Sequence, residues 1–461
     1  MPSLITEQST ALRVALYLVA LFIYSLLETM LAPVLPEIGK ALTPSIAKLG
    51  WVFSGLLFSG AVATPVIGRL ADIYDKRLVV TNVLVIVCIG VALAGAAQTI
   101  EMLVLAEVLQ GVGIGLVPVS VGAIGDSLPA KRAGVAGGLV VATLTASTAV
   151  GLLLSGPISS AWGFRGIFWM TLAPLASCAV ATYRLRSPRP VAKRELCVDW
   201  AGAGLLAAWM VAILLLITHA PKWGWVSIRV ACVYLLAAVV FALLLLLERK
   251  QRSALLDLNL LVRPSVAATC VIAFAVGFGS LSSYIIVPLL AQANPRSGIG
   301  LGASVSQAAN YLLPFAIGGT LVAPAAASLR GRFGSKFVVV AGGFALVCGV
   351  GSLALWHSTG WHLASGMALV GVAVGSALTE AINVSVTAAG REFASSISAI
   401  VYVVRNIGGT TGVQVSASIM DSTANLRTGL TEPAGFVNAL VIAAIVSTAT
   451  ILAGLSLRTH R

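Results

Sequence analysis

The sequence has few charged residues. Only 10% of its 461 residues are charged, while 58% are hydrophobic, and its mean hydropathy is +1.00. Water-soluble domains usually carry about 25% charged residues. Apolar stretches of about 20 residues, the length that crosses a hydrocarbon core as a helix, recur along the chain. The composition therefore predicts an all-α polytopic membrane protein, since lipid does not tolerate unpaired backbone groups.

Several motifs of other protein classes are also missing. No GxxxxGK[ST] phosphate-binding loop occurs, so transport driven directly by ATP is not expected. The six cysteines and four histidines are scattered, without disulfide or metal-ligand spacing. Catalytic side chains form no cluster in the sequence. We therefore expect no cofactor, no metal and no enzymatic activity.

Fourteen segments are long and apolar enough to be transmembrane helices. The first is too long for a signal peptide and lacks its basic start and cleavage site, so it is counted as a helix. The predicted spans are 12–33, 46–70, 78–98, 102–125, 134–157, 166–184, 200–218, 230–247, 265–290, 303–327, 337–356, 362–389, 394–418 and 435–457.

The formal net charge of +13 is distributed unevenly across these spans. With fourteen spans, 21 Lys and Arg residues lie on the side of the N-terminus, 7 lie on the other side, and Arg405 lies within a span. Basic residues are enriched in cytoplasmic loops. We therefore expect both termini in the cytoplasm and the protein in the cell (inner) membrane. Since no separate basic domain exists, no nucleic-acid partner is expected.

An internal repeat divides the chain. TPVIGRLADIYDKR at 64–77 corresponds to APAAASLRGRFGSK at 323–336 with an offset of 259, and GVGIG at 111–115 corresponds to GVAVG at 371–375 with an offset of 260. Parallel repeats are typical of transporters that move two bundles around a central site. We therefore predict a six-helix bundle in 1–185 and a second one in 264–461. Residues 186–263 form a cytoplasmic linker and two additional helices.

Several of these segments resemble a known family. GRLADIYDKR resembles GxLaDrxGrkr, the loop motif of the major facilitator superfamily. LLETMLAPVLPEI, VLQGVGIGL and GLLLSGPISSAWGFRGIFW resemble segments of its 14-helix drug:proton antiporter branch, as do the Asp-Trp-x-Gly at 199–202 and KWGW at 222–225. The resemblance covers essentially the whole chain. It implies two six-helix bundles plus two extra helices, with helices 1 and 4 lining a central cavity.

The sequence also departs from that family. Asp75 and Ile73 replace the usual glycine and arginine of the loop motif. Glu107 stands where the helix 4 motif usually has arginine, and Ser160 and Ala161 replace a glycine pair in helix 5. The details of proton coupling therefore do not carry over directly from the family.

Four ionisable residues are predicted well inside spans: Glu28, Glu107, Glu380 and Arg405. A strongly charged side chain there costs about 2.5–3.5 kcal/mol on insertion scales, so a functional role is the default hypothesis. Glu380 and Arg405 lie at similar depth on consecutive helices. They are expected to form either a structural ion pair or a cavity pair that opens during transport.

Glu28 and Glu107 are expected to differ from that pair, because their half of the chain has no arginine at their depth. The resemblance places both on cavity-lining helices. Two carboxyl groups close together in an apolar cleft can exchange a proton near neutral pH. Glu28 could instead reach the outer interface beyond Pro33 and Pro36. We predict that Glu28 exchanges a proton, binds a cationic substrate, or does both.

The resemblance also implies a gate. In the family, the loop aspartate contacts the N-terminus of a helix in the other half, and the basic loop residues add charge contacts. The resemblance implies this role for Asp72. Glycine and proline in helix 5 are expected to set a bend. The predicted gate residues are Gly68, Arg69, Asp72, Lys76 and Arg77, and the bend residues are Gly156 and Pro157.

Together these features predict a proton-coupled secondary transporter that exports amphipathic or cationic small molecules. An exporter of one endogenous metabolite is the alternative, and a membrane sensor that does not transport is a more remote one. The expected partners are a small-molecule substrate, protons and the lipid bilayer. The protein is expected to be a monomer.

Overall fold

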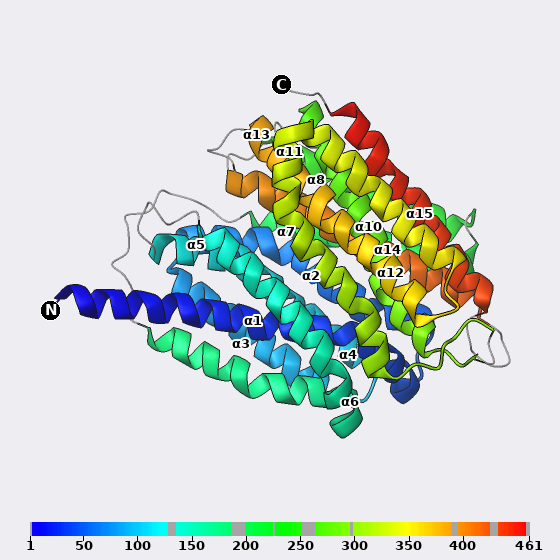
Figure 1. The fold of residues 1–461 in the computed structure, drawn as a ribbon, viewed down its shortest axis with the longest axis horizontal. Helices are drawn as coiled ribbons and strands as arrows, with labels where there is room; N and C mark the ends of the chain where they lie inside the picture. Colours follow the sequence, from blue (N-terminus) through cyan, green and yellow to red (C-terminus); the bar gives the residue numbers. More distant parts are fainter. Residues whose placement is uncertain are drawn as a thin grey trace.

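The computed structural model describes residues 2–127, 135–185, 199–224, 226–250, 263–295, 298–389, 394–424 and 432–457. Their regular secondary structure is helical (Figure 1). The elements are α1 (Pro2–Leu42), α2 (Ile46–Ile73), α3 (Lys76–Gly95), α4 (Ile100–Gly111), η1 (Val112–Gly115), α5 (Leu116–Ser127), α6 (Val135–Arg184), α7 (Trp200–Trp223), α8 (Ile228–Lys250), α10 (Pro264–Gln292), α11 (Val305–Leu355), α12 (Gly360–Ala373), η3 (Val374–Leu378), α13 (Thr379–Ala389), α14 (Ala394–Ser422) and α15 (Pro433–Ser456).

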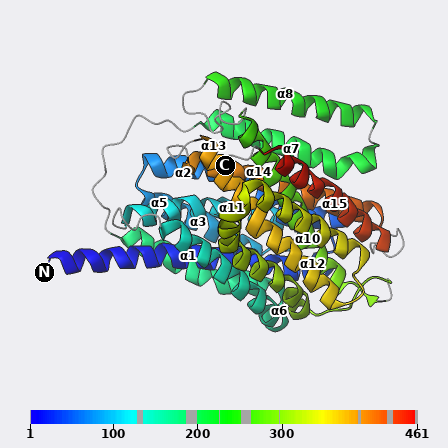
Figure 2. The ribbon, with the colours of Figure 1, turned by 45° about the horizontal axis from the view of Figure 1, so that its top comes forward.

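Helices α1 to α6 pack on one another, and so do α10 to α15; we call these groups the first and the second bundle. Within the first, α1 packs on α6 and α2 on α4; within the second, α11 packs on α12 and α10 on α14. The two additional helices lie outside the bundles. Helix α7 packs against α2 and α14, and α8 packs against α7 at the periphery of the molecule (Figure 2).

Twelve helical segments of the described residues are long and apolar enough to cross a membrane. The prediction of a polytopic all-α membrane protein is confirmed in this coarser form, whereas the count of fourteen spans is not. Residues Leu139–Arg184 count as one segment of 46 residues, although the backbone leaves the helical conformation at Gly163. Helix α14 is not among the twelve. It packs between α10 and α2, where it needs less apolar surface than a lipid-facing helix.

The repeat seen in the sequence recurs in the packing. Gly111 approaches the backbone carbonyl of Leu56 so closely that a Cβ would collide with it, and Gly371 approaches that of Phe315 in the same way. These pairs are related by the sequence offsets of 260 and 259. The glycines therefore allow helix 4 of each half to contact helix 2 backbone to backbone. Regular α-helix is interrupted after each glycine, directly after Gly111 by the 3₁₀ turn η1 and three residues after Gly371 by the π turn η3.

The two bundles meet at one end, which we call the closed end; it comprises residues 33–54 of the first bundle and 292 and 414–418 of the second. Gln292 Nε2 donates to the Pro33 carbonyl at 2.7 Å, and Gln414 Nε2 donates to the Ala47 carbonyl at 3.2 Å. Ser54 Oγ donates to Gln414 Oε1 at 3.2 Å. The opposite end, with residues 69–77 and 330–336, is called the open end, because the bundles diverge toward it (Figure 1).

Candidate functional site

Glu28 and Glu107, the two acids expected to act together, line one pocket of the first bundle. Apolar side chains of α1, α2 and α6 supply much of its wall, and the pocket is too narrow to hold a substrate in this conformation. The Glu107 side chain is buried, and its Oε1 accepts a hydrogen bond from Gln110 Nε2 at 3.3 Å. Glu28 is partly buried. The lining residues are Tyr24, Leu27, Glu28, Leu31, Leu56, Glu107, Gln110 and Phe168.

Arg405 of α14, in the second bundle, is near enough to Glu28 for their charges to interact, but these two described side chains form no direct ion pair. Arg405 Nη1 donates to Asn406 Oδ1 at 3.3 Å, while its buried Nε has no hydrogen-bond partner among the described residues. The guanidinium thus retains capacity to bind an anion. The sequence prediction did not anticipate this approach, because it compared each acid only with arginines of its own half.

Glu380 has a different partner from the one predicted. Its Oε2 lies 3.6 Å from Arg330 Nη1 of α11, so the expected ion pair with Arg405 is not the one that the structure shows. Asn383 Nδ2 also donates to this carboxylate oxygen at 3.5 Å. Arg330 lies between two predicted spans, but its long side chain reaches back to a buried acid. Equal depth on adjacent helices does not determine which side chains face each other.

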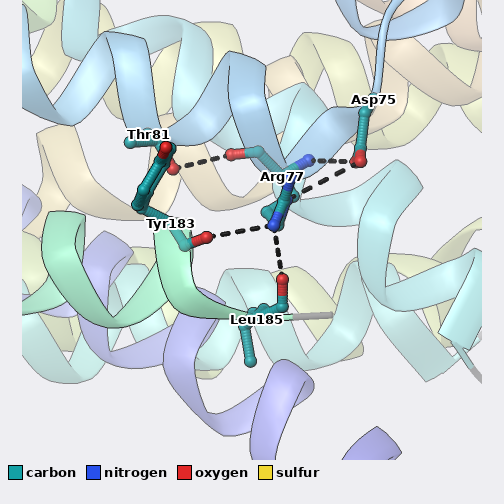
Figure 3. A network of polar contacts seen from close by, with 5 residues as sticks. All are labelled: Asp75, Arg77, Thr81, Tyr183 and Leu185. Atoms are coloured by element: carbon teal, nitrogen blue, oxygen red, sulfur yellow. Dashed lines mark hydrogen bonds and ion pairs between the residues drawn. The ribbon is translucent and has the colours of Figure 1, made fainter. Parts of the chain in front are cut away.

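Residues of the loop motif link the start of α3 to the C-terminal end of α6 (Figure 3). Asp75, which replaces the family glycine, is the N-cap of α3: its Oδ1 accepts a hydrogen bond from the Arg77 backbone N–H at 2.9 Å. The Arg77 guanidinium donates to the carbonyls of Tyr183 at 3.0 Å and Leu185 at 2.5 Å. A cation at these orphan carbonyls stabilises the C-terminal end of α6. These contacts of Arg77 lie within the first bundle and do not cross to the second.

The other predicted gate residues lie nearby. A Cβ at Gly68 would meet open space, so this glycine is not required for close packing in this conformation. Arg69 is in the last turns of α2, and the Lys76 ammonium lies beside Gly122 of α5. Asp72 is in the last turn of α2, but its side chain lies outside the described part of the structure. Its gate role stays a prediction.

Helix α6 contains both the fifth and the sixth predicted span, and its backbone departs from helical geometry between them, at Gly163, which has φ of 67°. The bend expected at Gly156 and Pro157 stays a prediction. Phe164 N donates to Glu37 Oε1 at 2.9 Å, so an acid of α1 caps the helix that starts after the break. Gly156 has another use: a Cβ there would collide with Ser306 of α11, so it permits close contact between the bundles.

Sequence reasoning missed Tyr24 as a part of the acidic pocket. Its hydroxyl is buried and has no hydrogen-bond partner among the described residues, and a Cβ at Gly113 would collide with its ring. The helical spacing of Tyr24 and Glu28, four residues apart, could have indicated that they share a face.

Comparisons with known proteins agree with the fold. The sequence matches the family described as Major Facilitator Superfamily over residues 17–413. An uncharacterized MFS-type transporter of Mycobacterium tuberculosis is 29% identical over 331 residues, which are 69% of this chain and 46% of the relative. The chain therefore spans about half the length of that relative.

The multidrug resistance protein Stp of Mycobacterium tuberculosis is 28% identical over 422 residues, covering 90% of this chain and 76% of Stp. Among solved structures, a bacterial homolog of the human lysosomal transporter Spinster superposes with a TM-score of 0.69 and 15% identity. The superposition covers 97% of each chain. This structural likeness concerns the fold.

Proposed function

Because the chain belongs to the Major Facilitator Superfamily, we propose that it is a proton-coupled secondary transporter that exports amphipathic or cationic small molecules by alternating access. The chain is a multi-pass membrane protein of a family whose relatives named above are transporters, in agreement with the prediction that it is not an enzyme. The name of Stp supports multidrug export as the substrate range. An exporter of one endogenous metabolite is the second candidate.

The observation that carries the proposal is that Glu28 shares a pocket with Glu107. Its charge also interacts with that of Arg405 in the second bundle. The attraction between ionised Glu28 and Arg405 stabilises the conformation in which the two side chains are near each other, whereas protonated Glu28 loses that attraction. Proton binding thus changes the free-energy difference between conformations. A cationic substrate could replace Arg405 as the partner of the carboxylate.

The orientation follows from the charge distribution. We propose that the open end, with Arg69, Lys76, Arg77, Arg330 and Lys336, faces the cytoplasm, since basic residues favour that side. The closed end then faces outwards. We further propose fourteen crossings, with α14 crossing once and Leu139–Arg184 crossing twice. At 1.5 Å per residue a 46-residue helical segment measures about 69 Å, more than twice the hydrocarbon thickness of about 30 Å.

Transport in proteoliposomes with an imposed proton gradient tests this function. We expect gradient-dependent movement of lipophilic cations, strongly reduced by Glu28→Gln. Glu107→Gln should shift the pH optimum of transport downwards, because Glu28 then ionises without a neighbouring negative charge. Glu432→Gln is the control: it removes an exposed acid outside the pocket and should leave transport unchanged. If the Glu28→Gln variant transports the substrate with an unchanged pH profile, the proposal is overturned.

A further inference from the structure

A second cavity lies at the closed end, apart from the acidic pocket. It has a volume of about 340 Å³ and lies between α2, α4 and the additional helix α7. None of its lining residues belongs to the pocket around Glu28 and Glu107. Small-molecule sites usually have volumes of about 300–1,000 Å³ and mostly apolar walls with a few polar groups. This cavity has both properties.

The walls and the rim of the cavity differ in chemistry. Ala47 and Trp51 of α2 and Val104 of α4 provide apolar surface. At the rim, Lys48 Nζ and Glu101 Oε1 lie 2.7 Å apart, with 59% and 65% of their side chains exposed. An ion pair so exposed contributes little to stability. The pair presents a positive and a negative group side by side. A ligand with one charge is therefore attracted by one of these groups and repelled by the other, whereas a zwitterion can place each of its charges next to the opposite one.

Hydrogen bonds connect this cavity with the contact between the bundles. Trp51 Nε1 donates to Thr218 Oγ1 of α7 at 3.1 Å, and Gln414 Nε2 of α14 donates to the same oxygen at 2.8 Å. Gln414 Nε2 also donates to the carbonyl of Ala47, another wall residue. The α2 and α7 walls are therefore held in place by the second bundle. Separation of α14 from α2 and α7 at this end would break the two bonds of Gln414 and change the shape of the cavity.

We propose that this cavity is a binding site for small amphipathic zwitterions, and that its occupation holds the closed end shut. The apolar body of the ligand lies against Trp51 and Val104, and its two charges pair with Lys48 and Glu101. A ligand that binds one conformation better shifts the equilibrium toward it. The site is separate from the pocket of the proposed proton coupling. The zwitterion is either a soluble compound or the headgroup of a phospholipid.

Binding can be measured by dansyl fluorescence with purified protein in nanodiscs of anionic phosphatidylglycerol. Four probes share one fluorophore: Nε-dansyl-lysine is a zwitterion, dansylcholine a cation, dansylglycine an anion and dansylamide uncharged. We expect Nε-dansyl-lysine to bind up to about fivefold tighter than the probes with one charge, the ratio set by one exposed ion pair. Equal binding of all four probes, or no binding, would overturn the proposal.

Two sets of variants locate the probe. Val104→Trp fills the cavity and should abolish binding, whereas Leu105→Trp, on the exposed side of the same helix, should preserve it. Lys48→Met should shift the preference to dansylcholine, and Glu101→Gln should shift it to dansylglycine. Binding that persists in Val104→Trp with unchanged charge preference in both single variants would place the probe elsewhere and refute the site.

Nanodiscs that also contain phosphatidylethanolamine distinguish the source of the zwitterion. Weaker Nε-dansyl-lysine binding there indicates that the lipid headgroup competes, whereas unchanged binding indicates a site for soluble ligands; both agree with zwitterion recognition.

The effect on the closed end is tested with Ser418→Cys, labelled by a membrane-impermeant maleimide. Position 418 is buried at the closed end, so its labelling reports opening. Nε-dansyl-lysine should slow labelling severalfold in this variant and not when Val104→Trp is added. Equal labelling rates with and without the probe would refute the effect on the closed end. Since neither measurement needs transport, the site can fail independently of the proposed function.

Discussion

Replacing Arg330 with Met should destabilise the protein, because it leaves the buried carboxylate of Glu380 without its partner. The Glu380 side chain is 1% exposed, and its Oε2 lies 3.6 Å from Arg330 Nη1. Its Oε1 has no hydrogen-bond partner among the described residues. Removing one member of a buried ion pair costs about 3–5 kcal/mol. Since 40% of the Arg330 side chain is exposed and screened by water, we expect a loss of about 1–3 kcal/mol.

Thermal unfolding of the protein in detergent measures this loss as a decrease in Tm. Adding Glu380→Gln to the Arg330→Met variant should reverse most of the decrease in Tm, because no buried charge is then left without a partner. Arg332→Met is the control for loss of a positive charge on the same helix; the Arg332 guanidinium lies over the Phe333 ring at 5.4 Å. The ion-pair assignment would be refuted by two results together. Arg330→Met would leave Tm unchanged, and the Tm decreases caused by Arg405→Met and Glu380→Gln would not be additive.

Three further predictions concern the caps and the contact between the bundles. Asp75→Ala should destabilise the protein by about 1 kcal/mol because the N-cap of α3 is lost, whereas Asp75→Gly should cost only a few tenths, both read from Tm. Gly156→Ala should place a methyl group against Ser306 and populate the conformation with separated bundles, which distances between spin labels on α2 and α14 would show. Thr218→Val should also populate the conformation with separated bundles, because it removes the oxygen that accepts hydrogen bonds from both Trp51 and Gln414. Leaving these donors unpaired costs about 1–3 kcal/mol. Unchanged distances between the spin labels would contradict both predictions.

The class of the protein could be predicted from the sequence because it depends on properties of the chain itself. Apolar runs of sufficient length indicate membrane helices whatever their packing, and the resemblance to the superfamily is confirmed. Local capping residues likewise mark helix starts: Ser45 precedes α2, Thr99 precedes α4, and Ser304 forms a capping box on α11. The repeated glycines allow close helix packing, because the absence of a side chain lets the backbone of a neighbouring helix approach.

Only the tertiary structure decided which side chains meet. Sequence depth paired Glu380 with Arg405, but rotation about the helix axes directs Glu380 toward Arg330 and brings Arg405 near Glu28 of the other bundle. Depth is a one-dimensional quantity, whereas contact also depends on how each helix is rotated and where its neighbour lies. For the same reason the sequence could identify Gly156 as a special position but not its contact with Ser306, which is 150 residues away in another bundle.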